Sequence, residues 1–389
     1  MATVAIDAEL SPRNKLELAG FASLLGFVAA LQISIAAAQI LLALMLVLWV
    51  VWLVARREPL DAPRMFVPLV TYAGVTLESA AFASDPRASF VDSKQLVLFL
   101  LVPAVYQLAR GSRASTVLQV IISVGAASAA FGIVQYGLLQ YDNLGRRPQG
   151  ALGHYMTYSG LLVLVTSAAA ARLLFSRDRA WPALMMPALL VALTLTFTRS
   201  AWVGACASIA LLLSLKDFRL VWVLPVLAAL FFALAPPRVT DRFYSMFDLR
   251  DPTSRDRVAM LREGTRMVAA HPLTGLGPNM VEKRYAEFQD PMESGRLNPH
   301  LHNVPMQIAA ERGLPALAVW IWLVVTLVID LARKLGASSQ PFIAAAGLAA
   351  IVGMLTAGLF EYNFGDSEFL MLFLVLVTLP YAADRRESA

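Results

Sequence analysis

Charge and cysteine are both scarce in this 389-residue chain. Only 15% of the residues are charged, and Cys206 is the one cysteine. Soluble globular chains carry about 25% charged residues, so the composition excludes an ordinary cytosolic enzyme. A single cysteine cannot form a disulfide within the chain, which excludes a disulfide scaffold. The sequence also lacks a Walker loop, a dinucleotide-binding fingerprint and a nucleophile elbow, so no nucleotide is expected as the energy source.

Long apolar runs are what the chain has instead, because 58% of its residues are hydrophobic. A helix needs about 20 apolar residues to cross a bilayer. The runs therefore predict an all-α polytopic membrane protein with about twelve transmembrane helices. The twelve expected spans are 18–33, 34–55, 66–83, 96–109, 114–139, 158–175, 181–198, 202–215, 220–236, 314–332, 341–360 and 367–382.

The basic residues of the short loops predict the orientation of these spans. With the N-terminus placed in the cytoplasm, 16 lysines and arginines fall in inside segments and five in short outside loops. Cytoplasmic loops carry such an excess, so both termini are expected inside. The formal net charge of +5 suits anionic lipid headgroups or phosphorylated substrates, and no nucleic-acid partner is expected.

Three regions follow from this topology. Residues 1–236 hold the first nine spans, 237–313 form one long outside loop, and 314–389 hold the last three spans and a cytoplasmic tail. The outside loop contains an apolar-periodic stretch, Arg255 to His271, which predicts a helix that ends at Pro272. A large loop on a helical bundle is a common place for functional residues.

Two arginines on the outer side are candidates for anion binding. Arg199 lies at the junction of two spans, where it could snorkel to the interface or hold a phosphate through its planar guanidinium. Arg257 points away from Arg255, Arg262 and Arg266 on the expected helix and towards its apolar face, with Leu261, Gly264 and Val268. A charge on an apolar face is costly unless it is paired, so Arg257 is interpreted as a ligand residue rather than a structural ion pair.

The chain has four histidines, His154, His271, His300 and His302, and all are expected outside. His302 is the candidate general base, because an imidazole can take a proton from a hydroxyl near neutral pH. A hydrogen-bonded loop histidine is the alternative. His300 and His302 could contribute to a metal site, but no third ligand has suitable spacing, so no metal is expected. His271 precedes Pro272 and is interpreted as a helix cap.

Two carboxylates, Glu361 and Asp366, lie in a short outside turn between the last two spans. They could pair with the outer arginines, or Asp366 could cap the following helix. Arg147 precedes Pro148 in another outside loop. The outer face therefore combines arginines, histidines and carboxylates, a set that favours transfer from an activated lipid phosphate.

Five segments of the chain resemble motifs of bacterial O-antigen ligases. In chain order they are Arg147 to Gly150, Thr198 to Trp202, Arg257 to Gly277, His302 to Pro315 and Glu361 to Glu368. Their order across roughly residues 145–370 is similar to that of the superfamily of O-antigen ligases, O-antigen polymerases and protein O-oligosaccharyltransferases. Leu261 stands where the family often has tryptophan, and Pro305 interrupts the stretch after His302.

The resemblance implies a reaction at the outer face of the bacterial inner membrane. An O-antigen glycan on undecaprenyl diphosphate would be transferred to a sugar hydroxyl of lipid A–core, with inversion and without a cofactor or metal. His302 would act as the base, and Arg199 and Arg257 would hold the diphosphate. The residues then expected to bind substrate are Arg147, Asn303, Glu361 and Asp366.

Two other functions remain open from the sequence. A polymerase or a protein glycosyltransferase would share the donor and differ in the acceptor, although the segment from Glu361 to Glu368 resembles the ligase. A transporter of lipid-linked glycans would place polar residues at mid-membrane, often in repeated halves. The polar residues here cluster at the outer ends of the spans, and no repeat is evident.

Overall fold

The computed structural model describes residues 12–248, 251–289 and 298–385, and helices dominate these parts of the chain. The elements are α2 (Pro12–Ala30), α3 (Ile35–Arg56), α4 (Phe66–Ala81), α5 (Pro86–Asp92), η1 (Ser93–Leu100), α6 (Leu101–Leu108), α7 (Ser112–Gly137), α8 (Tyr155–Phe175), α9 (Ala180–Leu195), α10 (Arg199–Lys216), η2 (Phe218–Trp222), α11 (Val223–Leu234), α12 (Pro237–Tyr244), α13 (Pro252–Ala270), α14 (Met280–Phe288), α15 (Val304–Ala337), α16 (Pro341–Gly358), η3 (Asn363–Gly365) and α17 (Ser367–Ala383).

Each of the twelve expected spans coincides with helical structure, and no strand occurs in the described residues. Six helical stretches there are long and apolar enough to cross a membrane, and four further apolar helices are shorter. The chain is therefore an all-α membrane protein, while the count of twelve crossings stays a prediction. The six are Ile35–Arg56, Pro86–Leu108, Ser112–Gly137, Tyr155–Phe175, Val304–Ala337 and Pro341–Gly358.

The outer helices expose apolar side chains, as expected for contact with lipid. On α3, Ile40, Val47 and Val54 recur every seven residues and are each more than half exposed. A row at this spacing runs along one face of a helix. Such a face is costly in water and suits the hydrocarbon core of a bilayer.

Small residues bring the inner helices close together and so position the candidate site. A Cβ added at Gly204 of α10 would lie 3.0 Å from the carbonyl oxygen of Gly353 on α16. Ser208 on α10 donates a hydrogen bond of 2.8 Å to the carbonyl of Ala349. Small residues and interhelical hydrogen bonds are typical of helix packing in membranes. This contact fixes the first turn of α10, which begins at Arg199, relative to the turn that follows α16.

The backbone of α15 is broken at one glycine. Gly313 has φ 79° and ψ 170°, so the backbone breaks there although helix continues on both sides. A side chain at this position would meet the carbonyl oxygen of Leu273 at 2.1 Å. Residues 304–312, which were expected to belong to the outside loop, form the first turns of α15. Pro305 does not interrupt them, because it occupies the first turn, where a proline needs no hydrogen-bond partner.

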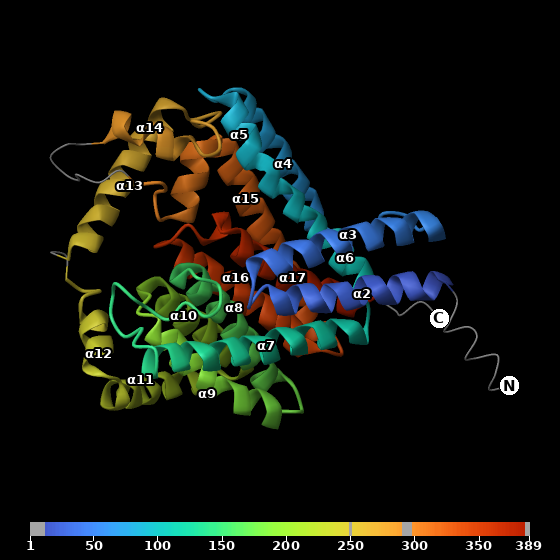
Figure 1. The fold of residues 1–389 in the computed structure, drawn as a ribbon, viewed down its shortest axis with the longest axis horizontal. Coiled ribbons are helices and arrows are strands. Elements are labelled where there is room, and N and C mark those ends of the chain that lie inside the picture. Colours follow the sequence, from blue (N-terminus) through green and yellow to red (C-terminus); the bar gives the residue numbers. More distant parts are fainter. Residues whose placement is uncertain (1–11, 249–250, 290–297, 386–389) are drawn as a thin grey trace.

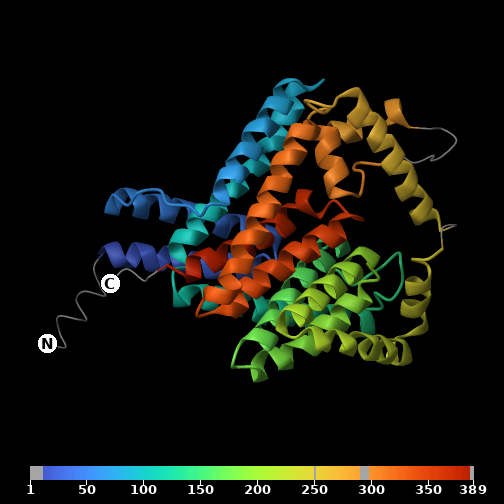
Figure 2. The same ribbon diagram turned by 180° about the vertical axis from the view of Figure 1, so that it is seen from behind.

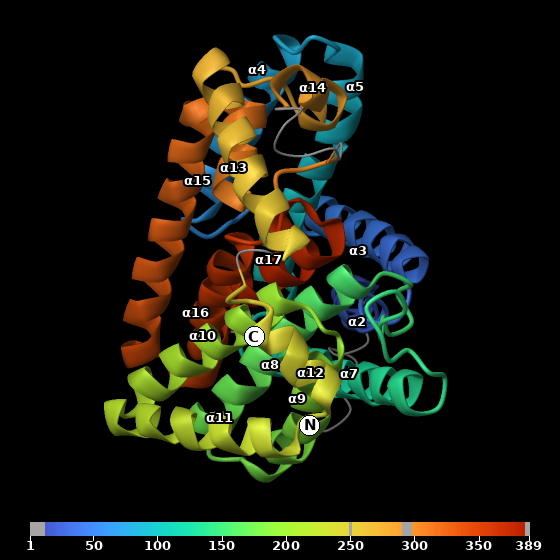
Figure 3. The same cartoon turned by 90° about the vertical axis from the view of Figure 1, so that its left-hand side faces the viewer.

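In the residues that the structure describes, the long loop contains the helices α12, α13 and α14 and the first turns of α15, and only the helix at α13 was expected. In Figure 1, α12 and α13 form one edge of the molecule and lead to α14, beside α5; the reverse view in Figure 2 shows the same arrangement. Figure 3 views this edge directly, with α13 in front. The helix α13 packs against α15, so the loop is a folded layer over the bundle.

Segments that were expected on the same side of the membrane contact one another. At the expected cytoplasmic end, Arg113 pairs with Glu17 at 2.7 Å, and Arg385 pairs with Asp61 at 2.8 Å. At the other end, the guanidinium of Arg199 donates to the carbonyl of Ser245 at 2.8 Å. These contacts agree with the expected alternation of the loops. Which end faces the cytoplasm stays a prediction.

Candidate active site

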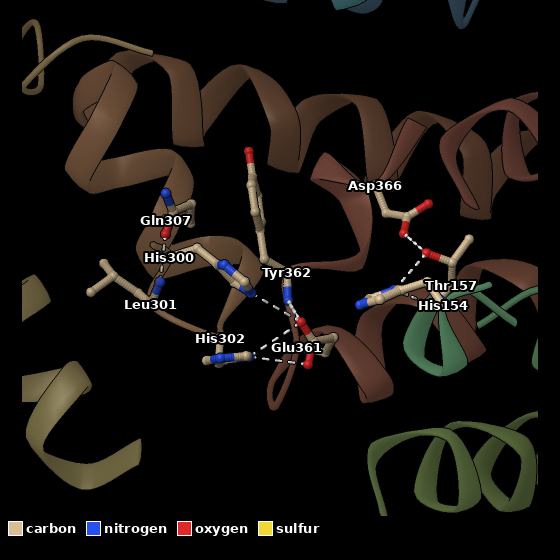
Figure 4. Close-up of polar contacts among 9 residues, drawn as sticks. All are labelled: His154, Thr157, His300, Leu301, His302, Gln307, Glu361, Tyr362 and Asp366. Atoms are coloured by element: carbon tan, nitrogen blue, oxygen red, sulfur yellow. Dashed lines mark hydrogen bonds and ion pairs between the residues drawn. The ribbon is translucent and has the colours of Figure 1, made fainter. Parts of the chain in front are cut away.

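Two histidines and one carboxylate form the centre of the site (Figure 4). His302 Nδ1 lies 3.0 Å from Oε2 and 3.2 Å from Oε1 of Glu361, and His300 Nε2 lies 3.3 Å from Oε1. An ionised carboxylate only accepts hydrogen bonds, so Nδ1 of His302 carries the proton of this pair. In neutral His302 the remaining nitrogen, Nε2, then has a lone pair and can accept a proton.

Local structure holds His302 in place. The residue has φ 48°, a left-handed conformation that costs a non-glycine residue about 1–3 kcal/mol and is concentrated at functional sites. On one side, the backbone N–H of Leu301 donates to Gln307 Oε1 at 2.7 Å. On the other side, Asn303 caps α15 by accepting the N–H of Met306 at 2.9 Å. The loop is thus fixed at both flanks of the candidate base.

Glu361 is ionised at neutral pH. Burial alone would raise its pKa, but the hydrogen bonds from His300 and His302 and their positive charge lower the pKa to about 2. The backbone N–H of Tyr362 also donates to Glu361 Oε1, at 3.1 Å. Glu361 was expected to bind substrate. In this structure its carboxylate orients the histidines, and a substrate contact stays a prediction.

No metal site was expected, because the sequence offered no third ligand with suitable spacing. The structure brings the carboxylate of Glu361 to the two histidines as a possible third ligand. One ligand atom from each of His300, His302 and Glu361 lies within 4.8 Å of the other two. Glu361 follows His302 by 59 residues, so sequence spacing could not reveal it.

Arg199 is buried at the start of α10 and is only 5% exposed, which contradicts the interpretation that it snorkels to the interface. Its guanidinium donates to the carbonyl of Ser245, and it lies 3.4 Å from Asp251 Oδ1. Thr198, the cap residue of α10, makes no side-chain cap hydrogen bond. The N–H groups of the first turn therefore add a partial positive charge beside Arg199.

Arg257 lies on α13 and is half-buried, whereas Arg255, Arg262 and Arg266 are exposed, as expected. The buried face, however, runs through Met260, Gly264 and Met267, and Leu261 is 41% exposed rather than part of it.

The guanidinium of Arg257 lies 5.8 Å from the centre of the Phe360 ring and forms no ion pair in the described part of the chain. Burial lowers the pKa of Arg257, nearby Arg199 lowers it further, and Glu361 acts in the opposite direction. Arg257 thus lies within electrostatic reach of both Arg199 and Glu361.

Two more arginines lie near Arg199 and Arg257, and only one of the two was identified from the sequence. Arg147 packs 4.4 Å from the ring of Tyr155 and donates to the carbonyl of Leu144 at 3.0 Å. Arg242 on α12 was not identified, because a helix of eight residues has no periodic pattern long enough to place it. Burial, then Arg199 and Arg147, lower the pKa of Arg242 to about 10, and its buried Nε has no hydrogen-bond partner among the described residues.

We call Arg147, Arg199, Arg242 and Arg257 the arginine cluster. Of the four side chains that act most strongly on the charge of Arg242, three are the other members of this cluster and one is Asp251. Like charges held together in a half-buried place repel one another. This arrangement favours a bound anion that carries more than one negative charge.

Asp366 and Asn303 serve first as helix caps. Asp366 Oδ1 accepts the N–H of Phe369 at 2.9 Å, as the capping alternative expected, and Oδ2 accepts the hydroxyl of Thr157 at 2.5 Å. Asn303 also donates through Nδ2 to the carbonyl of Leu359 at 3.1 Å. His271 lies at the C-cap of α13, as expected. Substrate contacts by Asp366 and Asn303 stay predictions.

A cavity of about 300 Å³ lies beside the histidines, between the first turns of α8, α10 and α17 and the end of α16. Both polar and apolar side chains line it. The polar ones include His154, Thr157, Thr198, His300, Glu361 and Asp366. The cavity is large enough to take a group the size of one sugar ring beside His300 and Glu361.

Parts of two motif segments, residues 272–277 and 310–314, hold the structure together. The loop after α13 pairs through its backbone with the broken part of α15: Leu276 N–H donates to Ala310, Gly277 to Glu311 and Leu314 to Pro272, at 2.8–2.9 Å. The buried pair Glu311–Arg312 lies at the same place, with 2.6 Å between its atoms. These residues anchor α13, which carries Arg257.

A comparison with protein families found one match. Residues 184–321, roughly a third of the chain, match the family model described as O-antigen ligase. The segment runs from α9 into α15 and includes Arg199, Arg242, Arg257 and His302, whereas Arg147 and Glu361 lie outside it. A comparison with curated proteins found no match.

Proposed function

We propose that this chain is an O-antigen ligase of the O-antigen ligase/polymerase superfamily, a proposal supported by the match of residues 184–321 to the family model described as O-antigen ligase. It transfers an O-antigen glycan from undecaprenyl diphosphate to a sugar hydroxyl of lipid A–core. The reaction takes place at the periplasmic face of the bacterial inner membrane, with both termini in the cytoplasm. It needs no cofactor, and no metal in principle, because a diphosphate is already a good leaving group.

One observation carries this proposal: an oriented histidine lies beside an arginine cluster whose positive charge exceeds the negative charge that the described residues place next to it. Arg257 connects the two parts, since it is within electrostatic reach of Glu361 and of Arg199. Transfer from a diphosphate-linked sugar needs both elements, a base for the attacking hydroxyl and cations for the departing diphosphate.

His302 is the base in this mechanism. Its Nδ1–H donates to Glu361, so Nε2 accepts the proton of the acceptor hydroxyl as that oxygen bonds to the anomeric carbon. The bond from the anomeric carbon to the diphosphate oxygen breaks in the same displacement, which inverts the anomeric centre. Glu361 is a positioning residue that keeps the imidazole in the required tautomer.

The arginine cluster receives the leaving group. Arg199 and Arg257 hold the diphosphate and stabilise the charge that develops on it, aided by the open first turn of α10. Arg147 and Arg242 complete the anion site. Asn303 and Asp366 contribute to substrate binding chiefly by fixing the first turns of α15 and α17.

The acceptor distinguishes this function from its alternatives. An O-antigen polymerase or a protein O-oligosaccharyltransferase would use the same donor and the same arginine cluster. The resemblance of residues 361–368 to the final ligase motif favours lipid A–core as the acceptor. A transporter would need no base, so the His302–Glu361 pair disfavours it.

The test is transfer by purified protein in the presence of EDTA. The wild type is expected to join undecaprenyl-diphosphate glycan to lipid A–core, and His302→Ala to lose about 10²–10⁴-fold in rate, because a general base contributes that much. His271→Ala, which removes the C-cap histidine of α13 and leaves His300, His302 and Glu361 in place, is the matched control and should retain activity.

Three outcomes would contradict the proposal. Elongated polyprenyl-linked chains with untouched lipid A–core would indicate a polymerase. Full activity of a folded His302→Ala variant would remove His302 from the mechanism. Transfer that stops in EDTA and resumes with added metal would contradict the metal-free reaction.

A further inference from the structure

The nitrogens and oxygens that meet at Glu361 lie close enough together to share one cation, since one ligand atom from each of the three side chains lies within 4.8 Å of the other two. His302 Nδ1 lies 3.0 Å from Oε2, and His300 Nε2 lies 3.3 Å from Oε1 (Figure 4). A tetrahedral Zn²⁺ with bonds of about 2.0–2.1 Å holds its ligand atoms about 3.3–3.4 Å apart. Small side-chain shifts therefore suffice to replace the hydrogen bonds of this group with metal bonds.

The chemistry of the three side chains selects the class of cation. Two imidazoles and one carboxylate are the ligand types of zinc sites, whereas Mg²⁺ and Ca²⁺ prefer shells of oxygen alone. The two rings lie close together, with 4.2 Å between their centres. Three protein ligands leave one position for water or a substrate oxygen, as in zinc sites that are open to solvent.

We propose that His300, His302 and Glu361 form a binding site for Zn²⁺ or a similar transition-metal dication. The site draws its ligands from the segment before α15 and from the turn after α16, two segments that only the tertiary structure brings together. Binding of Zn²⁺ at this site does not require a bound glycan. The charge of Arg257 opposes a cation here, and binding is weaker than in a zinc site without such a neighbour.

The consequence for catalysis rests on the proposed function. A metal on Nδ1 of His302 displaces the proton that this nitrogen donates to Glu361. The neutral imidazole then carries its proton on Nε2, which can no longer accept one from the acceptor hydroxyl. The metal thus holds the base in the wrong tautomer, and Zn²⁺ inhibits transfer reversibly.

A titration with ZnCl₂ tests the site without any assay of activity. The protein is purified through a tag that contains no histidine, stripped with EDTA, dialysed and titrated calorimetrically. The wild type is expected to bind one Zn²⁺ per chain and to ignore MgCl₂. His300→Ala and Glu361→Gln should weaken binding by at least about tenfold, the effect expected when a zinc site loses a ligand or its support. His271→Ala is the matched control and should bind as the wild type does.

Each variant is first compared with the wild type in thermal unfolding, and Glu361→Gln, which keeps the side-chain size, decides the matter if His300→Ala does not fold. Absence of Zn²⁺ binding by the wild type, or wild-type binding by both folded variants, overturns the site. Zn²⁺-loaded protein that transfers glycan at the full rate overturns the inhibition. Protein that transfers nothing in EDTA contradicts the proposed function instead, and the titration still decides the metal site.

Discussion

Two groups of buried charge in this protein are organised in opposite ways. Arg312 on α15 has its counter-ion next to it in the sequence, Glu311, and that carboxylate also accepts the N–H of Asn279 at 2.9 Å. The arginine cluster holds four guanidinium groups whose mutual repulsion is opposed by Asp251 and, at Arg257, also by Glu361. The first group has its charges paired within the chain and serves stability. The second has an excess of positive charge that a ligand can neutralise.

The two groups also depend on each other. Glu311 and Arg312 lie where α15 breaks at Gly313, and the loop from Pro272 to Gly277 is hydrogen bonded to that break. The same loop follows α13, which carries Arg257. The Glu311–Arg312 pair therefore helps to fix α13, the helix that carries Arg257. Substitutions in the two groups should separate stability from activity.

The largest effect is expected for Arg312→Ala. Removing one partner of a buried pair leaves Glu311 uncompensated and should lower the free energy of unfolding by about 3–5 kcal/mol. Thermal unfolding in detergent would measure this change, with Arg333→Ala, an exposed arginine of the same helix, as the control. Equal unfolding temperatures for the two variants would remove the distinction between the paired charges and the arginine cluster.

Arg257→Ala should have a comparable effect on activity and little on stability. Loss of a donor to developing negative charge costs about 10²–10³-fold in kcat, or about 2.7–4 kcal/mol of transition-state stabilisation. The control is Arg255→Ala, which removes an exposed arginine two residues earlier on α13. Steady-state transfer rates, with unfolding temperatures measured in parallel, would check the prediction. A folded Arg257→Ala variant with the rate of Arg255→Ala would contradict the assigned role.

A smaller effect is expected for Arg242→Gln. Loss of a charged hydrogen bond to the diphosphate should weaken donor binding by about 1.5 kcal/mol, roughly tenfold in KM. Without donor, the unfolding temperature should be unchanged or higher, because a repulsive charge has been removed. Arg238→Gln, on the same short helix but paired with Asp142, is the control. A lower unfolding temperature with an unchanged KM would make Arg242 a structural residue.

Helix periodicity and capping rules predict part of the site from the sequence alone. The position of Arg257 relative to three exposed arginines follows from the geometry of one helix. Asp366 as a cap follows from its place before an apolar run. The structure buries the side chain of Arg199, and its binding of a phosphate stays a prediction.

Other features could not be found in this way. Arg242 lies on a helix too short for a periodic signal, and α14 and the first turns of α15 are too polar to stand out as spans. The segment from Glu311 to Pro315 was grouped with the histidine motif, although its role is to anchor the loop after α13. A family motif marks residues that matter without separating chemistry from architecture.

The sequence by itself determined that this chain forms apolar helices and where most of them lie. It also determined which polar residues interrupt or flank these helices and are therefore candidates for function. These properties depend on the composition and periodicity of each segment taken alone. Only the tertiary structure decided that Glu361 meets His300 and His302, and that Arg242 joins three distant arginines. Such meetings depend on how small residues and the break at Gly313 let separate helices approach, which no periodicity within a single helix records.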